Sequence, residues 1–99
     1  MKSNFASDFE VKAYRIDIEE APGRLLNEIG DDQAQYQAFT ADINEPTGSR
    51  YSVAVVYNPQ TKRGGATVIG NGSSGSTTWF DGDDEDQILE KFVIGEDAM

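Results

Sequence analysis

The stretch YSVAVVY, residues 51–57, decides the fold expected for this chain. It is rich in β-branched and aromatic side chains, and apolar groups occur at both odd and even positions. A strand with that pattern is apolar on both faces, which is typical of the centre of a sheet. We therefore expect residues 51–57 to form a central β-strand.

The segment before this strand predicts its first partner. Residues 45–48, Glu-Pro-Thr-Gly, form a turn sequence that closes a hairpin. The preceding residues 31–44 fit two patterns, because Gln and Ala alternate as in a strand while the larger apolar side chains also fall on one helical stripe. We favour a strand over residues 35–43, because it would pair directly with the central strand.

The segments after the central strand predict further strands over residues 66–70 and 77–80. Residues 58–59, Asn-Pro, open a turn, and residues 62–65, Lys-Arg-Gly-Gly, are expected to complete that loop. Residues 71–76, NGSSGS, are expected to be a flexible hairpin tip. The second half of the sheet should therefore consist of short, sequential antiparallel strands.

The N-terminal part predicts one more strand and one short helix. Residues 9–18 alternate apolar and polar but change phase midway, which predicts a bulge or bend near Ala13-Tyr14. Pro22 and Gly30 are typical of a helix start and end, and the Leu and Ile side chains between them share a face. We expect a helix of about two turns between Pro22 and Gly30.

A second helix is expected near the C-terminus, where four apolar residues form a helical stripe. Asp84 and Gln87 fit a capping box at its start, and Gly95 is expected to end it. The stripe consists of Ile88, Leu89, Phe92 and Val93. The whole chain, residues 1–99, is therefore predicted to be one α+β domain. We expect a small antiparallel sheet of three to five strands in β-α-β-β-β-α order, with the C-terminal helix packed on one face.

The composition excludes several kinds of chemistry. The 99 residues include 18 acidic and 8 basic side chains, a formal charge of −10, with no His and no Cys. Disulfides, thiolate or imidazole nucleophiles and Cys/His zinc sites are therefore excluded. The carboxylates occur mostly in hydrophilic runs, where they should stay ionised and solvated. We expect a protein that is not an enzyme, with no cofactor and no catalytic residues.

Two sequence motifs resemble ligand-binding loops but lack the required context. An EF-hand loop starting at Asp81 would need Gly at its sixth position and Glu at its twelfth, where this chain has Asp86 and Phe92. We therefore expect no metal site. Residues 70–75 match G-x-G-x-x-G, but a strand-like sequence follows where dinucleotide binding requires a helix. The acidic run is expected to cap the C-terminal helix or to contact a partner.

The charge is unevenly distributed along the chain. Residues 81–99 hold eight acids and one Lys, a net charge of −7, while residues 1–80 carry a net −3. The pair Lys62-Arg63 is too small for a nucleic-acid-binding stripe, so no direct nucleic-acid binding is expected. No leader or membrane span is visible, which predicts a cytoplasmic protein. A second acidic group flanks the first helix: Asp17, Glu19, Glu20, Glu28, Asp31 and Asp32.

These features favour an acidic binding protein. In size and charge the chain resembles the small acidic inhibitors that phages use against host defences, such as anti-CRISPR and DNA-mimic proteins. The resemblance implies that it inhibits or regulates a nucleic-acid-handling protein by presenting a DNA-like negative surface to a basic surface of that partner. The candidate partner-binding residues are Asp31, Asp32, Trp79, Asp81, Asp83, Asp84, Glu85, Asp86 and Glu90.

An alternative is a small accessory or structural subunit whose acids only keep it soluble. It would bind its partner through a β-edge or an aromatic patch. Trp79-Phe80 is such a patch, unless both rings pack the C-terminal helix against the sheet. The two hypotheses differ in salt response, because binding through charge weakens with ionic strength and an apolar interface is nearly indifferent.

Overall fold

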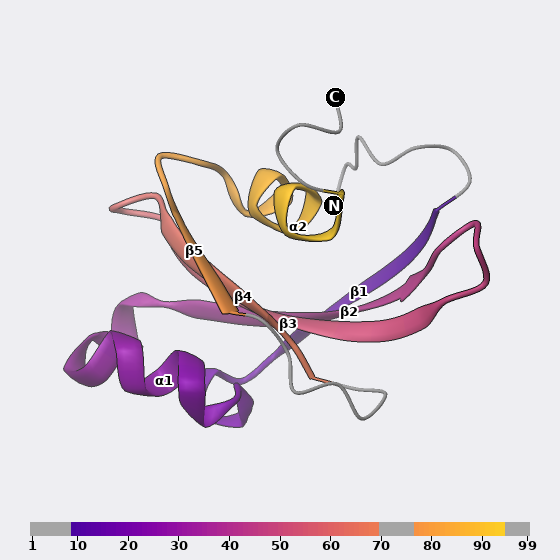
Figure 1. Ribbon diagram of the computed structural model, residues 1–99. Helices are drawn as coiled ribbons and strands as arrows, with labels where there is room; N and C mark the ends of the chain where they lie inside the picture. The colour runs from indigo at the N-terminus through magenta and orange to yellow at the C-terminus, as the bar shows by residue number, and fades with distance from the viewer. Residues whose placement is uncertain (1–8, 70–76, 95–99) are drawn as a thin grey trace.

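The computed structural model shows a five-stranded antiparallel sheet with helices on both sides (Figure 1). The structure describes residues 9–69 and 77–94. The predicted α+β class and antiparallel sheet are confirmed, but four strands rather than three follow the first helix. The elements are β1 (Glu10–Ile16), η1 (Ile18–Glu20), α1 (Gly23–Ile29), η2 (Gly30–Gln35), β2 (Gln37–Asn44), β3 (Arg50–Asn58), β4 (Arg63–Val68), β5 (Thr77–Asp81) and α2 (Glu85–Ile94), where η denotes a 3-10 helix.

The sheet is a meander in the order β1-β2-β3-β4-β5, with β3 at its centre as expected. Residues 53–58 of β3 are all buried, because both of their faces are covered. The ambiguous segment 31–44 divides between the two patterns: it begins in the 3-10 helix η2 and continues as strand β2. The expected strand is therefore confirmed, and the tip expected at residues 71–76 lies outside the described residues.

Two hydrophobic clusters lie on opposite faces of this one sheet. The α2-face cluster joins the sheet to α2 and consists of Phe39, Ala41, Ile43, Val53, Val55, Tyr57, Ala66, Phe80, Ile88 and Leu89. The α1-face cluster joins the other face to α1 and η2 and consists of Ala21, Leu25, Ile29, Tyr36, Ala38, Ala54 and Val56. Alternate residues of β2 and β3 enter alternate clusters, as the period of a strand requires.

The phase change in β1 has a different cause from the one expected. The bulge predicted near Ala13-Tyr14 is wrong, because β1 pairs with β2 in unbroken register from end to end. Val11 lies opposite Ile43 and packs on the α2-face cluster, whereas Ile16 lies opposite Ala38 and packs on the α1-face cluster. The apolar residues change parity because the two ends of β1 are covered on different faces.

The loop predicted over residues 62–65 is also wrong, because β4 begins at Arg63. The glycine pair suggested a loop, but the first glycine is needed for packing against α2. A Cβ atom on Gly64 would lie 2.9 Å from the carbonyl oxygen of Val56 and would overlap the end of Ile88. Gly64 therefore lets α2 approach the sheet closely.

The second glycine has the same role on the opposite face. A Cβ atom on Gly65 would lie 2.7 Å from atoms of the Trp79 ring, which covers this position from β5. Phe80, the next residue, faces the other way and belongs to the α2-face cluster. Of the two adjacent rings, only Phe80 therefore packs against α2, which corrects the interpretation that both do.

Thr40 is expected to weaken the fold through its hydroxyl. In the described part of the chain, Oγ1 of Thr40 is the one buried side-chain polar atom without a hydrogen-bond partner. Thr40→Val removes this unpaired group and should raise the free energy of unfolding by about 1 kcal/mol in urea denaturation. As a control, Thr67→Val should lower it, because Thr67 Oγ1 accepts bonds from Arg24 Nε at 2.7 Å and from the Thr77 hydroxyl at 3.0 Å. A loss of stability in Thr40→Val would contradict this account.

Candidate functional site

The acidic run lies between the end of β5 and the first turn of α2. Gly82, with φ 84°, turns the chain out of β5, and its N–H donates to the carbonyl of Lys62 at 2.9 Å. The backbone N–H of Asp84 donates to Gln87 Oε1 at 3.0 Å, which is the glutamine half of the expected capping box. The helix end expected at Gly95 lies outside the described residues.

Two acids of this run are held by lysines. Asp83 accepts bonds of 3.1 and 3.2 Å from Nζ of Lys91, which lies eight residues further along the chain, in α2. Asp84 accepts a bond of 2.8 Å from Nζ of Lys62, in the turn between β3 and β4. This bond and the attraction of the Asp84 charge raise the pKa of Lys62. The carboxylate of Asp84 therefore binds a lysine, while its backbone N–H takes part in the cap.

Two further acids are paired with arginines. Glu85 lies 3.3 Å from Arg15 of β1, and Asp81 lies 3.8 Å from Arg63 of β4. Arg63 also lies 3.5 Å from Glu28 of α1 and stacks over the Trp79 ring at 4.6 Å from its centroid. Each of these cations comes from a different part of the fold than its partner, so the pairs tie α2 and β5 to the rest of the molecule.

Two of the remaining candidates in this region, Glu90 and Trp79, are not freely exposed. Glu90 is buried, with 8% of its surface exposed. Trp79 is half-buried between the α1-face cluster and Arg63. The side chain of Asp86 lies outside the described residues. The run that dominates the charge of the sequence is therefore largely neutralised by neighbouring cations.

The second acidic group forms a more open surface. It lies on the connection from β1 to β2, where Asp17, Glu19, Glu20, Glu28, Asp31 and Asp32 are all exposed; we call these six residues the β1–β2 acidic surface. The cation in this segment, Arg24, is turned toward the sheet, where Nε donates to Thr67 and Nη2 donates to the carbonyl of Val68 at 2.8 Å. The carboxylates therefore keep a local excess of negative charge.

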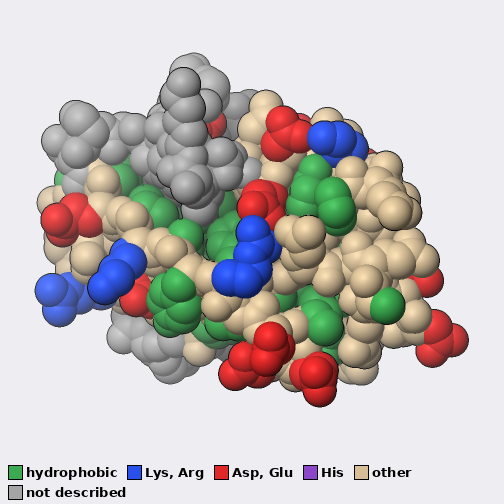
Figure 2. Space-filling view, turned by 180° about the vertical axis from the view of Figure 1, so that it is seen from behind, with side chains coloured by type: hydrophobic (Ala, Val, Ile, Leu, Met, Phe, Trp, Pro, Cys, Tyr) green, Lys and Arg blue, Asp and Glu red, His purple; other side chains and the backbone are tan. Residues whose placement is uncertain are grey.

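The two acidic groups come together at Arg63, which lies 3.5 Å from Glu28 and 3.8 Å from Asp81. Apart from this contact, the connection containing α1 lies on one side of the sheet and α2 on the other (Figure 1). Figure 2 shows acidic side chains interspersed with Lys, Arg and hydrophobic groups on the face seen there. The sequence could not indicate this, because pairing between distant elements decides which carboxylates remain free.

No protein-family model matches the chain, and neither the curated proteins nor the solved structures contain a match. Across residues 9–69 and 77–94, no group of three or more acidic side chains is arranged to hold a metal ion. None of the helices described is long and apolar enough to cross a membrane. Surface charge and the shape of the sheet are therefore the features of this protein that bear on its function.

Proposed function

We propose that this chain is a non-enzymatic acidic protein that inhibits or regulates a nucleic-acid-handling protein. The β1–β2 acidic surface would occupy a basic groove of the partner in the cytoplasm, as phage anti-defence inhibitors of the DNA-mimic class do. The observation that supports this is that six exposed carboxylates lie within residues 17–32, while Arg24 of the same segment is bound to the sheet.

The physical basis of the proposal is competition for the same cations that bind DNA. Duplex DNA carries one negative charge per roughly 1.7 Å of its axis, so a basic groove is adapted to a dense array of anions. A rigid protein surface with clustered carboxylates attracts such a groove over a long range and competes with DNA for it. Five acids contribute less, since each already faces a cation of this chain: Glu28 of the same surface and, in the acidic run, Asp81, Asp83, Asp84 and Glu85.

The test compares two triple variants with equal loss of charge. One variant, Glu19→Gln/Asp31→Asn/Asp32→Asn, removes acids that make no ion pair within residues 9–69 and 77–94. The control, Asp81→Asn/Asp83→Asn/Asp84→Asn, removes acids that are paired. Binding partners are captured from a nuclease-treated lysate at about 50 and 500 mM salt. The native chain and each variant are then compared in how well they displace each purified partner from labelled duplex DNA. The first variant should lose affinity by about tenfold or more, while the control should retain most of it.

The opposite pattern would overturn the proposal. One such result is a partner that stays bound at high salt and binds the first variant as tightly as the native chain. It would show that the carboxylates of the β1–β2 acidic surface do not determine the affinity. Loss of binding only in the control variant would place the contact at the start of α2. Circular dichroism of both variants confirms that any loss is not due to unfolding.

A further inference from the structure

The outer edge of β1 is an open end of the sheet. β1 is the first strand in the sheet order, and among the described residues it pairs only with β2. It is seven residues long, in unbroken register and without a bulge that would twist the edge away. Alternate backbone N–H and C=O groups of such a strand point outward without a partner and can accept another strand.

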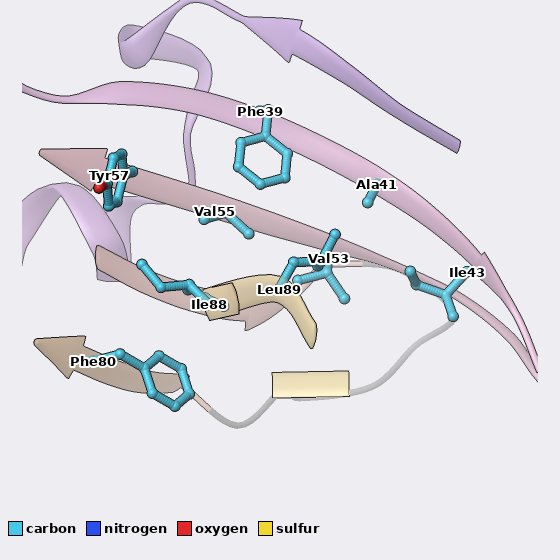
Figure 3. Close-up of a cluster of buried hydrophobic side chains, with 10 residues drawn as sticks. Phe39, Ala41, Ile43, Val53, Val55, Tyr57, Phe80, Ile88 and Leu89 are labelled. Atoms are coloured by element: carbon cyan, nitrogen blue, oxygen red, sulfur yellow. The ribbon is translucent and has the colours of Figure 1, made fainter. Parts of the chain in front are cut away.

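A hollow adjoins this edge on the side of α2. It has a volume of about 230 Å³ and is lined by Ala13, Tyr14, Arg15, Phe39 and Glu85. Figure 3 shows Phe39 at the border of the α2-face cluster on the strand next to β1. The small side chain of Ala13 leaves this space open, and the apolar groups of Ala13 and Phe39 provide its apolar lining.

Arg15 and Glu85 supply the charged groups that line the hollow. Arg15 Nη2 donates to Glu85 Oε1 at 3.3 Å, and Nη1 donates to Gln37 Oε1 at 3.2 Å. These bonds fix the guanidinium at the hollow, and Glu85 compensates its charge. The hollow therefore suits a single apolar side chain rather than a charged one.

The opposite face of the same edge is cationic and aromatic. Tyr14 is 51% exposed, and Lys12 is exposed two residues before it on the same face. Lys12 makes no ion pair with the described residues, since Asp42 across from it accepts a bond of 2.7 Å from the Ser52 hydroxyl. An acidic side chain placed beside Lys12 would meet a cation that no described acid of this chain pairs with.

We propose that the β1 edge receives an extended segment of a partner protein as a sixth strand. An apolar side chain of that segment enters the hollow beside Ala13, and an acidic side chain next to it in sequence faces Lys12. The two side chains fall on opposite faces because successive residues of a strand alternate. A second copy of this chain is the less favoured occupant, because two molecules of charge −10 repel each other.

This inference uses a surface separate from the β1–β2 acidic surface and does not depend on the function proposed above. Its test uses an array of synthetic ten-residue peptides in which the central residue and its neighbours are varied. The array should select an apolar central residue with Asp or Glu beside it. Methylation of backbone nitrogens in the best peptide should abolish binding, because strand addition requires main-chain hydrogen bonds.

Variants of the protein locate the site. Ala13→Arg fills the hollow and should weaken binding of the best peptide by about tenfold or more. The matched control is Thr78→Arg, on the same face but on the opposite edge strand, β5, and it should leave binding unchanged. Lys12→Glu should change the preferred neighbour from Asp or Glu to Lys or Arg.

Three results would overturn the proposal. One is the absence of any selected peptide, and another is binding that ignores both Ala13→Arg and Lys12→Glu. The third is a dimer mass in light scattering that Ala13→Arg converts to a monomer, since it would make a second copy the occupant. Because the β1–β2 acidic surface is unaltered in these variants, the failure of one proposal leaves the other standing.

Discussion

Gly65→Val is expected to lower the free energy of unfolding by about 3 kcal/mol, at the upper end of the usual cost of overpacking. A Cβ atom at this position would lie 2.7 Å from the rigid Trp79 ring, well inside normal van der Waals contact. The ring cannot move away cheaply, because it packs on the α1-face cluster and carries Arg63 on its other side. The melting temperature of a domain this size should fall by about 12–24 °C.

Thermal and urea denaturation followed by circular dichroism measure this change. Gly23→Ala is the matched control, because its added Cβ meets nothing within 4 Å and Ala favours a helix, so stability should stay equal or rise slightly. A double-mutant cycle with Trp79→Val removes the ring, and most of the penalty at Gly65 should then disappear. If the penalty persists without the ring, the close approach is not its cause.

Leu25→Ala and Leu89→Ala are expected to have similar, large effects, each lowering the free energy of unfolding by about 3 kcal/mol. Both side chains are fully buried, at 0% exposure, but they lie on opposite faces of the sheet. Each truncation removes apolar contacts and leaves a cavity that the surrounding strands cannot fill. Equal costs would show that α1 contributes as much to the core as α2 does.

The measurement is urea denaturation of both variants, with Leu26→Ala as a control in α1. Leu26 is only partly buried, so its truncation should cost clearly less than that of its neighbour. A negligible effect of Leu25→Ala beside a large effect of Leu89→Ala would mean that the α1 side of the sheet is open to solvent.

The central strand and its hairpin could be predicted because their pattern is local. Residues 51–57 are apolar on both faces, and the burial of β3 on both faces is the direct consequence. Local patterns gave wrong predictions in two places: a bulge was predicted from the phase change in residues 9–18, and a loop from the glycine pair in residues 62–65. In both places the physical cause is packing against a distant element, and local patterns carry no information about it.

The candidate site was predicted less well than the fold. The number and position of the carboxylates follow from the sequence, but their partners do not, since Arg15 and Glu85 are separated by 70 positions. The hollow at the β1 edge was missed for the same reason. Its one local signal is the alternation of β1, which places the small residue Ala13 on the same face as Val11 and Arg15, the face that carries Phe39.

The meander order of the sheet has a consequence for how the chain folds. The connections from β2 to β3 and from β3 to β4 span only residues 45–49 and 59–62, whereas residues 17–36 separate β1 from β2. Short loops close at a lower entropic cost, so β2, β3 and β4 are expected to form the folding nucleus, and β1 should dock late. The strand whose outer edge we propose as a partner site is therefore expected to complete the sheet only after its centre has formed.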